Sequence, residues 1–391
     1  MTVFLELENY NYFVIALALL SFVIAVLNLK FLDSLGESLL VVDQKQINKL
    51  VSVMVPARNE KENIGKCIDA LLNQDHPNLE ILILDDASTD GTSEIIQEYA
   101  QSDPRIQIIH GKELPVTWVG KNWACHQLAN KAKGDFLLFV DADTILASGT
   151  ISAAIHESVT RNINLLTLTP RRTASCITER LLFPFLDWAS FSWIPMKTAH
   201  STRNPHLSAT FGQFILFDRA AYSDVGGHEA IHDNMFDDFE LGRLVKGKGL
   251  KWMLFDGANW VHVLAYKGNV DAFKAVSRSL FPAVYYRVSI LMMLSVLIIG
   301  LGLLPPLTVL AGIMSYPIEI ESLFAATLSI GLVAIPWLIL CRKFKHSSLL
   351  VPLYPVSMAL ILAVGFHSMF THGLGRTTWK GRQVGKRKIR L

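Results

Sequence analysis

The chain has 391 residues, 51% of them hydrophobic and 18% charged, against about 25% charged residues in an average soluble domain. This composition excludes a disordered chain and argues against a wholly soluble one, while four widely spaced cysteines exclude a disulfide framework and a thiolate zinc site. The net charge of +2 combines a mildly acidic body with a basic C-terminus, so nucleic acid is not an expected partner, because binding it requires a basic, aromatic-rich body.

The first predicted element is a transmembrane anchor within residues 1–44. Residues 12–29 carry no charge, and a run of that length is near the lower limit for crossing a bilayer, at roughly 17–25 residues. A signal peptide is disfavoured because Glu6 and Glu8 precede the run and no small-residue cleavage site follows it. The positive-inside rule predicts a cytoplasmic domain after the anchor, since the run is followed by Lys30, Lys45 and Lys49.

A soluble domain is predicted over residues 45–279. Short runs rich in Val, Ile and Leu predict buried strands, and stretches with helical spacing of apolar residues predict helices between them. The strands are expected at 50–55, 80–84, 105–109 and 136–140, and the helices at 63–72, 92–100 and 122–133. This alternation predicts an α/β fold with a mostly parallel sheet and helices on both faces, which binds ligands at the carboxyl ends of its strands.

Polar residues follow the first two predicted strands at those ends. Pro56, Arg58 and Glu60 come after the first strand, and Asp85 and Asp86 come after the second. A carboxylate only accepts hydrogen bonds, which suits the base or ribose of a nucleotide. The chain has neither a Gly-x-Gly-x-x-Gly motif nor a phosphate loop, so neither of those nucleotide sites is predicted.

Two more carboxylates, Asp141 and Asp143, leave the fourth predicted strand two residues apart. Mg²⁺ and Mn²⁺ prefer oxygen ligands and commonly keep substrate phosphates and water in their coordination shell. The pair therefore predicts Mg²⁺ or Mn²⁺ bound together with a diphosphate. His262 is a candidate third ligand, with a packed core histidine as the alternative.

A C-terminal membrane region is predicted over residues 280–372, with apolar segments at 288–314, 323–340 and 349–370. Acidic residues at 319 and 321 suit the outside, and basic residues at 342–345 suit the inside. A third crossing would place the basic tail, residues 373–391, outside, against the rule. Two solutions stay open: either the last segment is re-entrant, or the first, interrupted at residues 305–306, is not a simple span. The tail itself is expected at anionic lipid headgroups.

Together, VSVMVPARNE, LILDDASTDGT and FVDAD resemble the family 2 glycosyltransferases, which have the Rossmann-like GT-A fold. The resemblance covers about residues 51–278. It implies that Asp86 lies near the base of a nucleotide-sugar donor and that Asp141 and Asp143 hold the metal and diphosphate. Asp238, beside Asp237, is implied as the general base. Further candidates for binding the donor are Lys121 and Arg278, which suit its phosphates, and Gln213, which lies in a stretch similar to the family's sugar-binding segment.

The segments WVGKNWACHQLA and TWKGRQV narrow the resemblance to bacterial carotenoid- and hopanoid-associated enzymes of the diaponeurosporenoate type. This implies an inverting enzyme of the inner membrane with a cytoplasmic catalytic domain, which moves a hexose from a UDP-sugar to an isoprenoid lipid. A polymer synthase is disfavoured, because residues 275–279 lack the Gln-x-x-Arg-Trp motif of such enzymes. Two alternatives stay open. One is transfer to a polyprenyl phosphate, for which Arg243, Lys246 and Lys248 supply charge, and the other is an inactive membrane scaffold.

Overall fold

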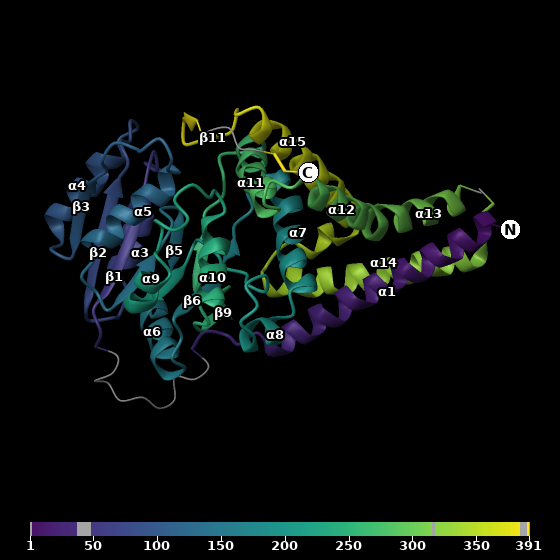
Figure 1. Ribbon diagram of the computed structural model, residues 1–391, viewed down its shortest axis with the longest axis horizontal. Coiled ribbons are helices and arrows are strands. Elements are labelled where there is room, and N and C mark those ends of the chain that lie inside the picture. Colours follow the sequence, from purple (N-terminus) through teal and green to yellow (C-terminus); the bar gives the residue numbers. More distant parts are fainter. Residues whose placement is uncertain (1, 37–47, 315–316, 384–388, 391) are drawn as a thin grey trace.

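A seven-stranded sheet forms the centre of the computed structural model, which describes residues 2–36, 48–314, 317–383 and 389–390 (Figure 1). The strand order is β3-β2-β1-β4-β8-β6-β9. Only β8 runs antiparallel to its neighbours in this sheet, so the predicted mostly parallel α/β sheet is confirmed. The strands are β1 (Val51–Ala57), β2 (Leu79–Asp85), β3 (Ile106–His110), β4 (Phe136–Phe139), β6 (Leu165–Thr169), β8 (Ile215–Asp218) and β9 (Trp252–Asp256).

Both faces of the sheet are covered by helices, which explains why its central strands are apolar at nearly every position. Along β1, Val53 and Val55 pack into the core on one face, and Met54 packs into the core on the other. The first face carries α3 (Ile64–Leu72), α4 (Thr92–Ser102) and α6 (Thr150–Thr160). The second carries α5 (Gly120–Lys131), α9 (Arg219–Asp224) and α10 (Asp237–Gly247).

A small three-stranded sheet lies beyond the end of β4 and helps to form the site. Its order is β5-β10-β7, with β5 spanning Thr144–Leu146, β7 Arg171–Arg172 and β10 Val261–Val263. The Leu264 N–H donates to the Asp143 carbonyl at 3.0 Å, so the chain after β10 is fixed beside the carboxylates that follow β4. The helix α11 (Asn269–Ala283) then runs from this point toward the membrane helices.

Among the residues that the structure describes, four helical segments are long and apolar enough to cross a membrane: 11–31, 288–313, 320–343 and 348–373. The first belongs to α1 (Thr2–Phe31). The second comprises α12 (Val288–Ile298), a π-helical turn η1 (Ile299–Leu303) and α13 (Leu304–Ile313). The third is α14 (Ile320–Lys343), and the fourth joins η2 (Ser348–Leu353) to α15 (Tyr354–Gly373). Membrane segments on both sides of the α/β domain are therefore confirmed.

Three of these segments form an arm that points away from the sheet, and the fourth lies at its base (Figure 1). In the arm, α14 packs against both α1 and α13, whereas α15 packs on α11 and on α7 (Ile177–Trp193). The chain thus leaves along α12–α13 and returns along α14. The segment 348–373 is also long enough to cross, so the two solutions, a re-entrant last segment or a first segment that is not a simple span, both stay predictions. Lys45, one of the residues used to predict the orientation of the anchor, lies outside the described residues.

The described part of the basic tail contacts the sheet domain rather than an open surface. After α15, the strands β11 (Thr378–Trp379) and β12 (Arg382–Gln383) form a hairpin. Within the hairpin, Arg382 pairs with Asp86, which directly follows β2. The expectation that the tail lies at lipid headgroups is therefore wrong for residues 378–383, while residues 384–388 and 391 lie outside the described part of the chain.

A buried charge cluster joins the α/β domain to the arm. On α7, Asp187 is 4% exposed, accepts a hydrogen bond from Arg172 Nη1 at 2.6 Å and contacts His346 Nε2 at 2.7 Å. Burial opposes the ionisation of Asp187, but Arg172 and His346 outweigh it, so the pKa of Asp187 is lowered. The cluster links β7, α7 and the segment that follows α14.

Removing Asp187 is expected to destabilise the junction between domain and arm. In Asp187→Ala the Arg172 guanidinium stays buried without its partner, which costs about 3–5 kcal/mol of unfolding free energy. Thermal unfolding in detergent measures the loss. The control is Lys49→Ala, which removes an ion pair whose two side chains are each 52% exposed, so a change of about 0–1 kcal/mol is expected. Equal losses in the two variants would contradict the assigned role of the cluster.

Candidate active site

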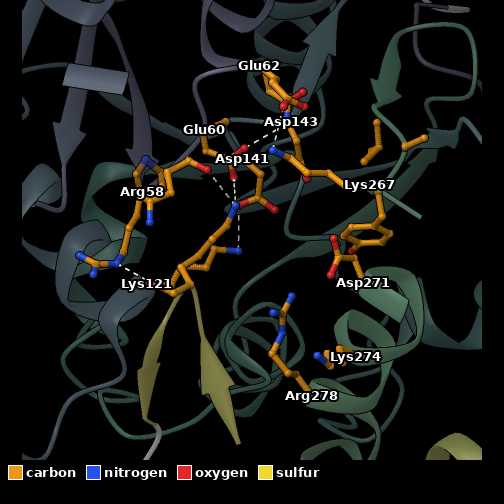
Figure 2. A pocket seen from close by; sticks show the side chains of 18 of the residues that line it. Arg58, Glu60, Glu62, Lys121, Asp141, Asp143, Lys267, Asp271, Lys274 and Arg278 are labelled. Carbon is orange, nitrogen blue, oxygen red and sulfur yellow. Dashed lines mark hydrogen bonds and ion pairs between the residues drawn. The ribbon is translucent and has the colours of Figure 1, made fainter. Parts of the chain in front are cut away.

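A cavity of about 450 Å³ opens at the carboxyl ends of β1 and β4, between the sheet and α11 (Figure 2). Its volume is within the range of small-molecule sites, roughly 300–1,000 Å³. Most residues that the sequence predicted for the site line this one cavity, although they come from distant stretches of chain. They are Pro56, Arg58, Glu60, Lys121, Asp141, Asp143, Gln213 and Arg278.

The loops that follow β1 and β2 are fastened to each other, which fixes Arg58 and Glu60 at the cavity. The Asn59 N–H donates to Ser88 Oγ at 3.0 Å, and the Glu60 N–H donates to Thr92 Oγ1 at 2.8 Å. In return, the Thr89 N–H donates to Asn59 Oδ1 at 2.9 Å. Asn59 has a φ of 52°, a left-handed conformation that Asn tolerates better than most residues.

The two carboxylates after β2 have different surroundings. Asp85 does not line the cavity; its Oδ1 accepts the Ser88 N–H at 3.2 Å within its own turn, so the structure does not bring this donor-site candidate to the cavity. Asp86 does not line the cavity either; it is 2% exposed, and its Oδ2 accepts from Arg382 Nη1 at 2.6 Å. Burial raises the pKa of Asp86 in spite of the cation at Arg382.

Lys121, at the start of α5, connects the carboxylates of β4 with those of α10. Its Nζ lies 2.9 Å from Asp141 Oδ1 and 3.4 Å from Asp237 Oδ2. Burial disfavours the ammonium form of Lys121, but the two carboxylates outweigh it and raise its pKa well above the ordinary value. The predicted metal pair and the predicted catalytic pair therefore share one cation.

Asp143 has the surroundings expected of a metal ligand. Its Oδ1 is buried and has no hydrogen-bond partner among the described residues. Burial and the nearby carboxylates of Asp141 and Glu60 raise its pKa to about 7. Within residues 2–36, 48–314, 317–383 and 389–390, no three His, Cys, Asp or Glu side chains are placed to hold a metal by themselves. The carboxylates of Asp141 and Asp143, one of which has an unpaired buried oxygen, do fit Mg²⁺ or Mn²⁺ if phosphate and water complete the coordination shell of the ion.

Asp238 lies in the first turn of α10, where its carboxylate is held by backbone amides. Oδ2 accepts the Gly212 N–H at 3.1 Å, and Oδ1 accepts the Phe239 N–H at 2.8 Å. Burial and the neighbouring Asp237 raise the pKa of Asp238 to about 7, although Lys121 opposes the shift. A carboxylate with a pKa close to neutral is suited to accept a proton in a general-base step.

The chain is similar to known glycosyltransferases in sequence and in fold. Residues 52–226 match the sequence model of glycosyl transferase family 2. Residues 52–226 are a family 2 glycosyltransferase domain. The chain is also 26% identical over 234 residues to the 4,4'-diaponeurosporenoate glycosyltransferase of Staphylococcus haemolyticus, covering 59% of this chain and 61% of that protein. It is 26% identical over 228 residues to the enzyme of the same name from Staphylococcus aureus strain USA300, covering 56% and 57%.

Among solved structures, the chain is similar to a mannosyltransferase from Pyrobaculum calidifontis, solved in complex with GDP-mannose and Mn²⁺. The TM-score is 0.56 at 16% identity, with 93% of this chain and 99% of the other covered. This likeness confirms the GT-A fold of the glycosyltransferase domain. The chain spans about three-fifths of the length of the curated relatives that it matches.

His262 is not brought to the carboxylates of the glycosyltransferase domain. It lies on β10, and burial together with the cations of Arg171 and Lys345 lowers its pKa. Successive strand residues point to opposite faces, and the next residue, Val263, is the one that lines the cavity. The structure therefore does not bring this candidate third metal ligand to the cavity, and its side chain is partly buried rather than packed in the core.

Several residues of the site escaped the sequence analysis. Lys274 lines the cavity four positions before Arg278 on α11, a spacing that places both cations on one helix face and that the sequence does show. Gly212 holds Asp238, and a Cβ at this position would lie 3.3 Å from Asp238 Oδ2 and from Lys121 Nζ. A lone glycine gives no sequence signal for that role. The other residues missed include Glu62, Asn63, Tyr266, Lys267, Asp271, Thr378, Lys380 and Gly381.

Proposed function

We propose that the protein is a membrane-bound, inverting glycosyltransferase that moves a hexose from a nucleotide-diphosphate sugar, a UDP-sugar in the first instance, to an isoprenoid lipid. The observation that carries the proposal is the convergence of Asp141, Asp143, Lys121 and the Asp237–Asp238 pair at one end of the sheet. The names of the curated relatives support a carotenoid carboxylate as the acceptor.

The donor would occupy the 450 Å³ cavity with its diphosphate toward Asp141 and Asp143. These two residues would hold Mg²⁺ or Mn²⁺, which as a Lewis acid stabilises the charge on a departing diphosphate. Lys274 and Arg278 add positive charge on the α11 side, and guanidinium geometry suits phosphate oxygens. Arg58 and Glu60 form the nucleotide side of the same cavity.

The acceptor would attack from the side of α10. As the acceptor oxygen bonds to the anomeric carbon, its proton passes to the Asp238 carboxylate, and the bond from that carbon to the diphosphate oxygen breaks. A single base and a direct displacement give inversion at the anomeric carbon. An acceptor carboxylate is already ionised near neutral pH, so transfer to it requires Asp238 much less.

An apolar cavity of about 340 Å³ supports a lipid acceptor. It lies where α7, α12, η1 and α15 meet, beside the end of α11. The same helix α11 contributes Arg278 to the donor cavity and Leu280 to the apolar cavity, which Val284 directly after the helix also lines, so α11 joins the two. The aromatic segment of α7 supplies Phe185, Trp188 and Trp193. An acceptor with a polar end and a long apolar chain fits this pair of cavities.

Filling the apolar cavity is expected to weaken acceptor binding alone. Gly365 lines it, and a Cβ there would already meet Leu291 Cδ1 at 3.3 Å, so Gly365→Leu places a side chain in the space for the lipid. We expect a KM for the lipid acceptor raised by about tenfold, the equivalent of one or two lost methylene contacts. The matched control is Gly331→Leu on α14, where a Cβ meets nothing within 4 Å. Donor hydrolysis without acceptor should not change, and an unchanged acceptor KM would contradict the assignment.

The alternative acceptor, a polyprenyl phosphate, receives little support from the basic residues that kept it open. Arg243 pairs with Glu240 at 2.9 Å. Lys246 is buried, and its Nζ donates to the carbonyls of Ala199 and Leu207. Arg243 and Lys246 therefore already have partners within the domain, and Lys248, the third residue, is exposed at the end of α10.

Mass spectrometry of lipids from cells with and without the protein tests the proposal. A hexose added to one isoprenoid class, dependent on Asp143, is expected. Membranes incubated with a panel of nucleotide sugars, with and without Mn²⁺, identify the donor. Identical lipid profiles together with absent donor turnover would contradict the proposal, and donor turnover that persists in Asp143→Ala would contradict the metal assignment.

A further inference from the structure

The C-terminal hairpin, residues 378–383, lies at the donor cavity although it is more than 100 residues from the nearest strand-end loop that lines it. Thr378, Lys380 and Gly381 are among the lining residues. Figure 2 shows the two yellow strands of the hairpin reaching the edge of the cavity near Lys121. The hairpin is thus one wall of a cavity whose other walls are the strand ends and α11.

The hairpin is attached to the two nucleotide-side loops by charged contacts. Lys380 Nζ donates to Glu60 Oε1 at 2.6 Å, and the Lys380 carbonyl accepts from Arg58 Nε at 3.1 Å. Arg382 Nη1 donates to Asp86 Oδ2 at 2.6 Å. Because Asp86 is almost fully buried, this last pair is shielded from water and keeps the hairpin in one place.

Two observations indicate that the hairpin lines the donor cavity and does not fill it. The cavity keeps about 450 Å³ with the hairpin in place, so there is room for a ligand. The ammonium of Lys380 also points at the acidic side of the cavity, where it contacts Glu60 and lies near Asp143. A diphosphate bound next to Asp141 and Asp143 would find this cation on its remaining open side.

We propose that the hairpin completes the donor site: Lys380 binds the diphosphate of the nucleotide sugar, and Arg382 is a positioning residue that holds Lys380 in place through Asp86. The inference rests on the proposed function, since it assumes a nucleotide diphosphate in this cavity. It adds a binding residue from a segment outside residues 52–226, the part that matches the family.

Nucleotide binding to the full-length protein in detergent tests the proposal. Titration calorimetry with UDP and with GDP, each with Mn²⁺, shows which nucleotide the wild type binds. For that nucleotide, Lys380→Met is expected to raise Kd about tenfold, the loss of one charge-assisted hydrogen bond, while Lys380→Arg stays near the wild type. The matched control is Arg376→Met, because Arg376 is an exposed tail cation that does not line the cavity.

The positioning role of Arg382 is tested by comparing the nucleotide affinities of two variants of this residue. Arg382→Met should weaken nucleotide binding, and Arg382→Lys, which keeps a cation for Asp86, should restore part of the affinity. Because Lys380 binds the donor in the ground state and Arg382 positions Lys380, the variants of either residue should raise the KM for the donor more than they lower kcat. A purely structural role would lower the unfolding temperature of Arg382→Met and Arg382→Lys alike without a split between KM and kcat.

Limited trypsin digestion gives a second measurement that needs no variant. Cleavage after Lys380 and Arg382, followed by mass spectrometry, should slow when the nucleotide and Mn²⁺ are present, because the bound donor holds the wall in place. Two results would overturn the inference and leave the proposed function standing. One is cleavage that is faster or unchanged with nucleotide and Mn²⁺, and the other is a Lys380→Met protein that binds the nucleotide as well as or better than the wild type. Absence of binding by the wild type to either nucleotide would overturn both.

Discussion

Replacing Asp238 with Asn is expected to lower the rate of transfer to a hydroxyl acceptor by about 10²–10⁴-fold, the usual contribution of a general base. The carboxylate is fixed by the Gly212 and Phe239 amides and has a pKa near 7. The amide of Asn has the same shape and accepts no proton; its oxygen keeps one of the two backbone contacts, while its NH2 group cannot accept the other. Donor binding should survive, because Asp238 is absent from the residues that line the donor cavity.

The pH profile gives the same prediction independently. Below about pH 7 the raised pKa keeps Asp238 protonated, so transfer to a hydroxyl should rise as the pH increases through this value. The Asn variant should lose that rise. Stopped assays with radiolabelled donor measure it, with a hydroxyl lipid and a carboxylate lipid as parallel acceptors.

The matched control is Glu240→Gln, which removes another acid from the first turn of α10 that pairs with Arg243 and lies outside the site. It should retain the wild-type profile. Transfer to a carboxylate lipid should fall far less than transfer to a hydroxyl lipid in Asp238→Asn. Unchanged transfer to the hydroxyl lipid would show that another group takes the proton.

Replacing Asp143 with Ala is expected to abolish metal-dependent donor turnover and the stabilisation of the protein by metal and nucleotide. At a ligand concentration 100 times the Kd, binding stabilises the folded state by about 2.7 kcal/mol. The wild type should therefore unfold at a higher temperature with Mg²⁺ and nucleotide than without them, and Asp143→Ala should not. Protons compete with the metal for this carboxylate, so the wild-type shift should be larger at pH 8 than at pH 6.

Without metal and nucleotide, the loss of the Asp143 carboxylate is not expected to lower the stability of the folded protein. Folding raises the pKa of Asp143, so its ionised form is less favourable in the folded than in the unfolded chain, and the protein loses stability as the pH rises toward about 7. Without ligand, Asp143→Asn should then be at least as stable as the wild type above pH 7. The exposed acid Asp224 on α9 supplies the control, Asp224→Asn, in which the ligand-induced shift should persist. A lower melting temperature of ligand-free Asp143→Asn would contradict this account.

The sequence by itself determined the elements of the sheet and the residues at its carboxyl end. Runs such as residues 51–55 are buried at every position, and apolar at all but Ser52, because both faces of the sheet are covered, and this pattern defines β1 on its own. Asp141 and Asp143 could be placed at the site because they directly follow β4. Such signals are local: each depends on a few neighbouring residues whose periodicity or position at a strand end is visible in the chain.

The tertiary structure alone decided the contacts between distant segments. In the folded chain, Lys121 lies between Asp141 and Asp237. Val263, and not His262, lines the cavity, and α15 packs at the base of the arm. The tertiary structure also brought Lys380 and Arg382 to loops more than 290 residues earlier in the chain. No periodicity encodes such pairs, because they depend on how whole helices and strands pack, and a basic tail has the same local composition whether it meets lipid headgroups or buried carboxylates.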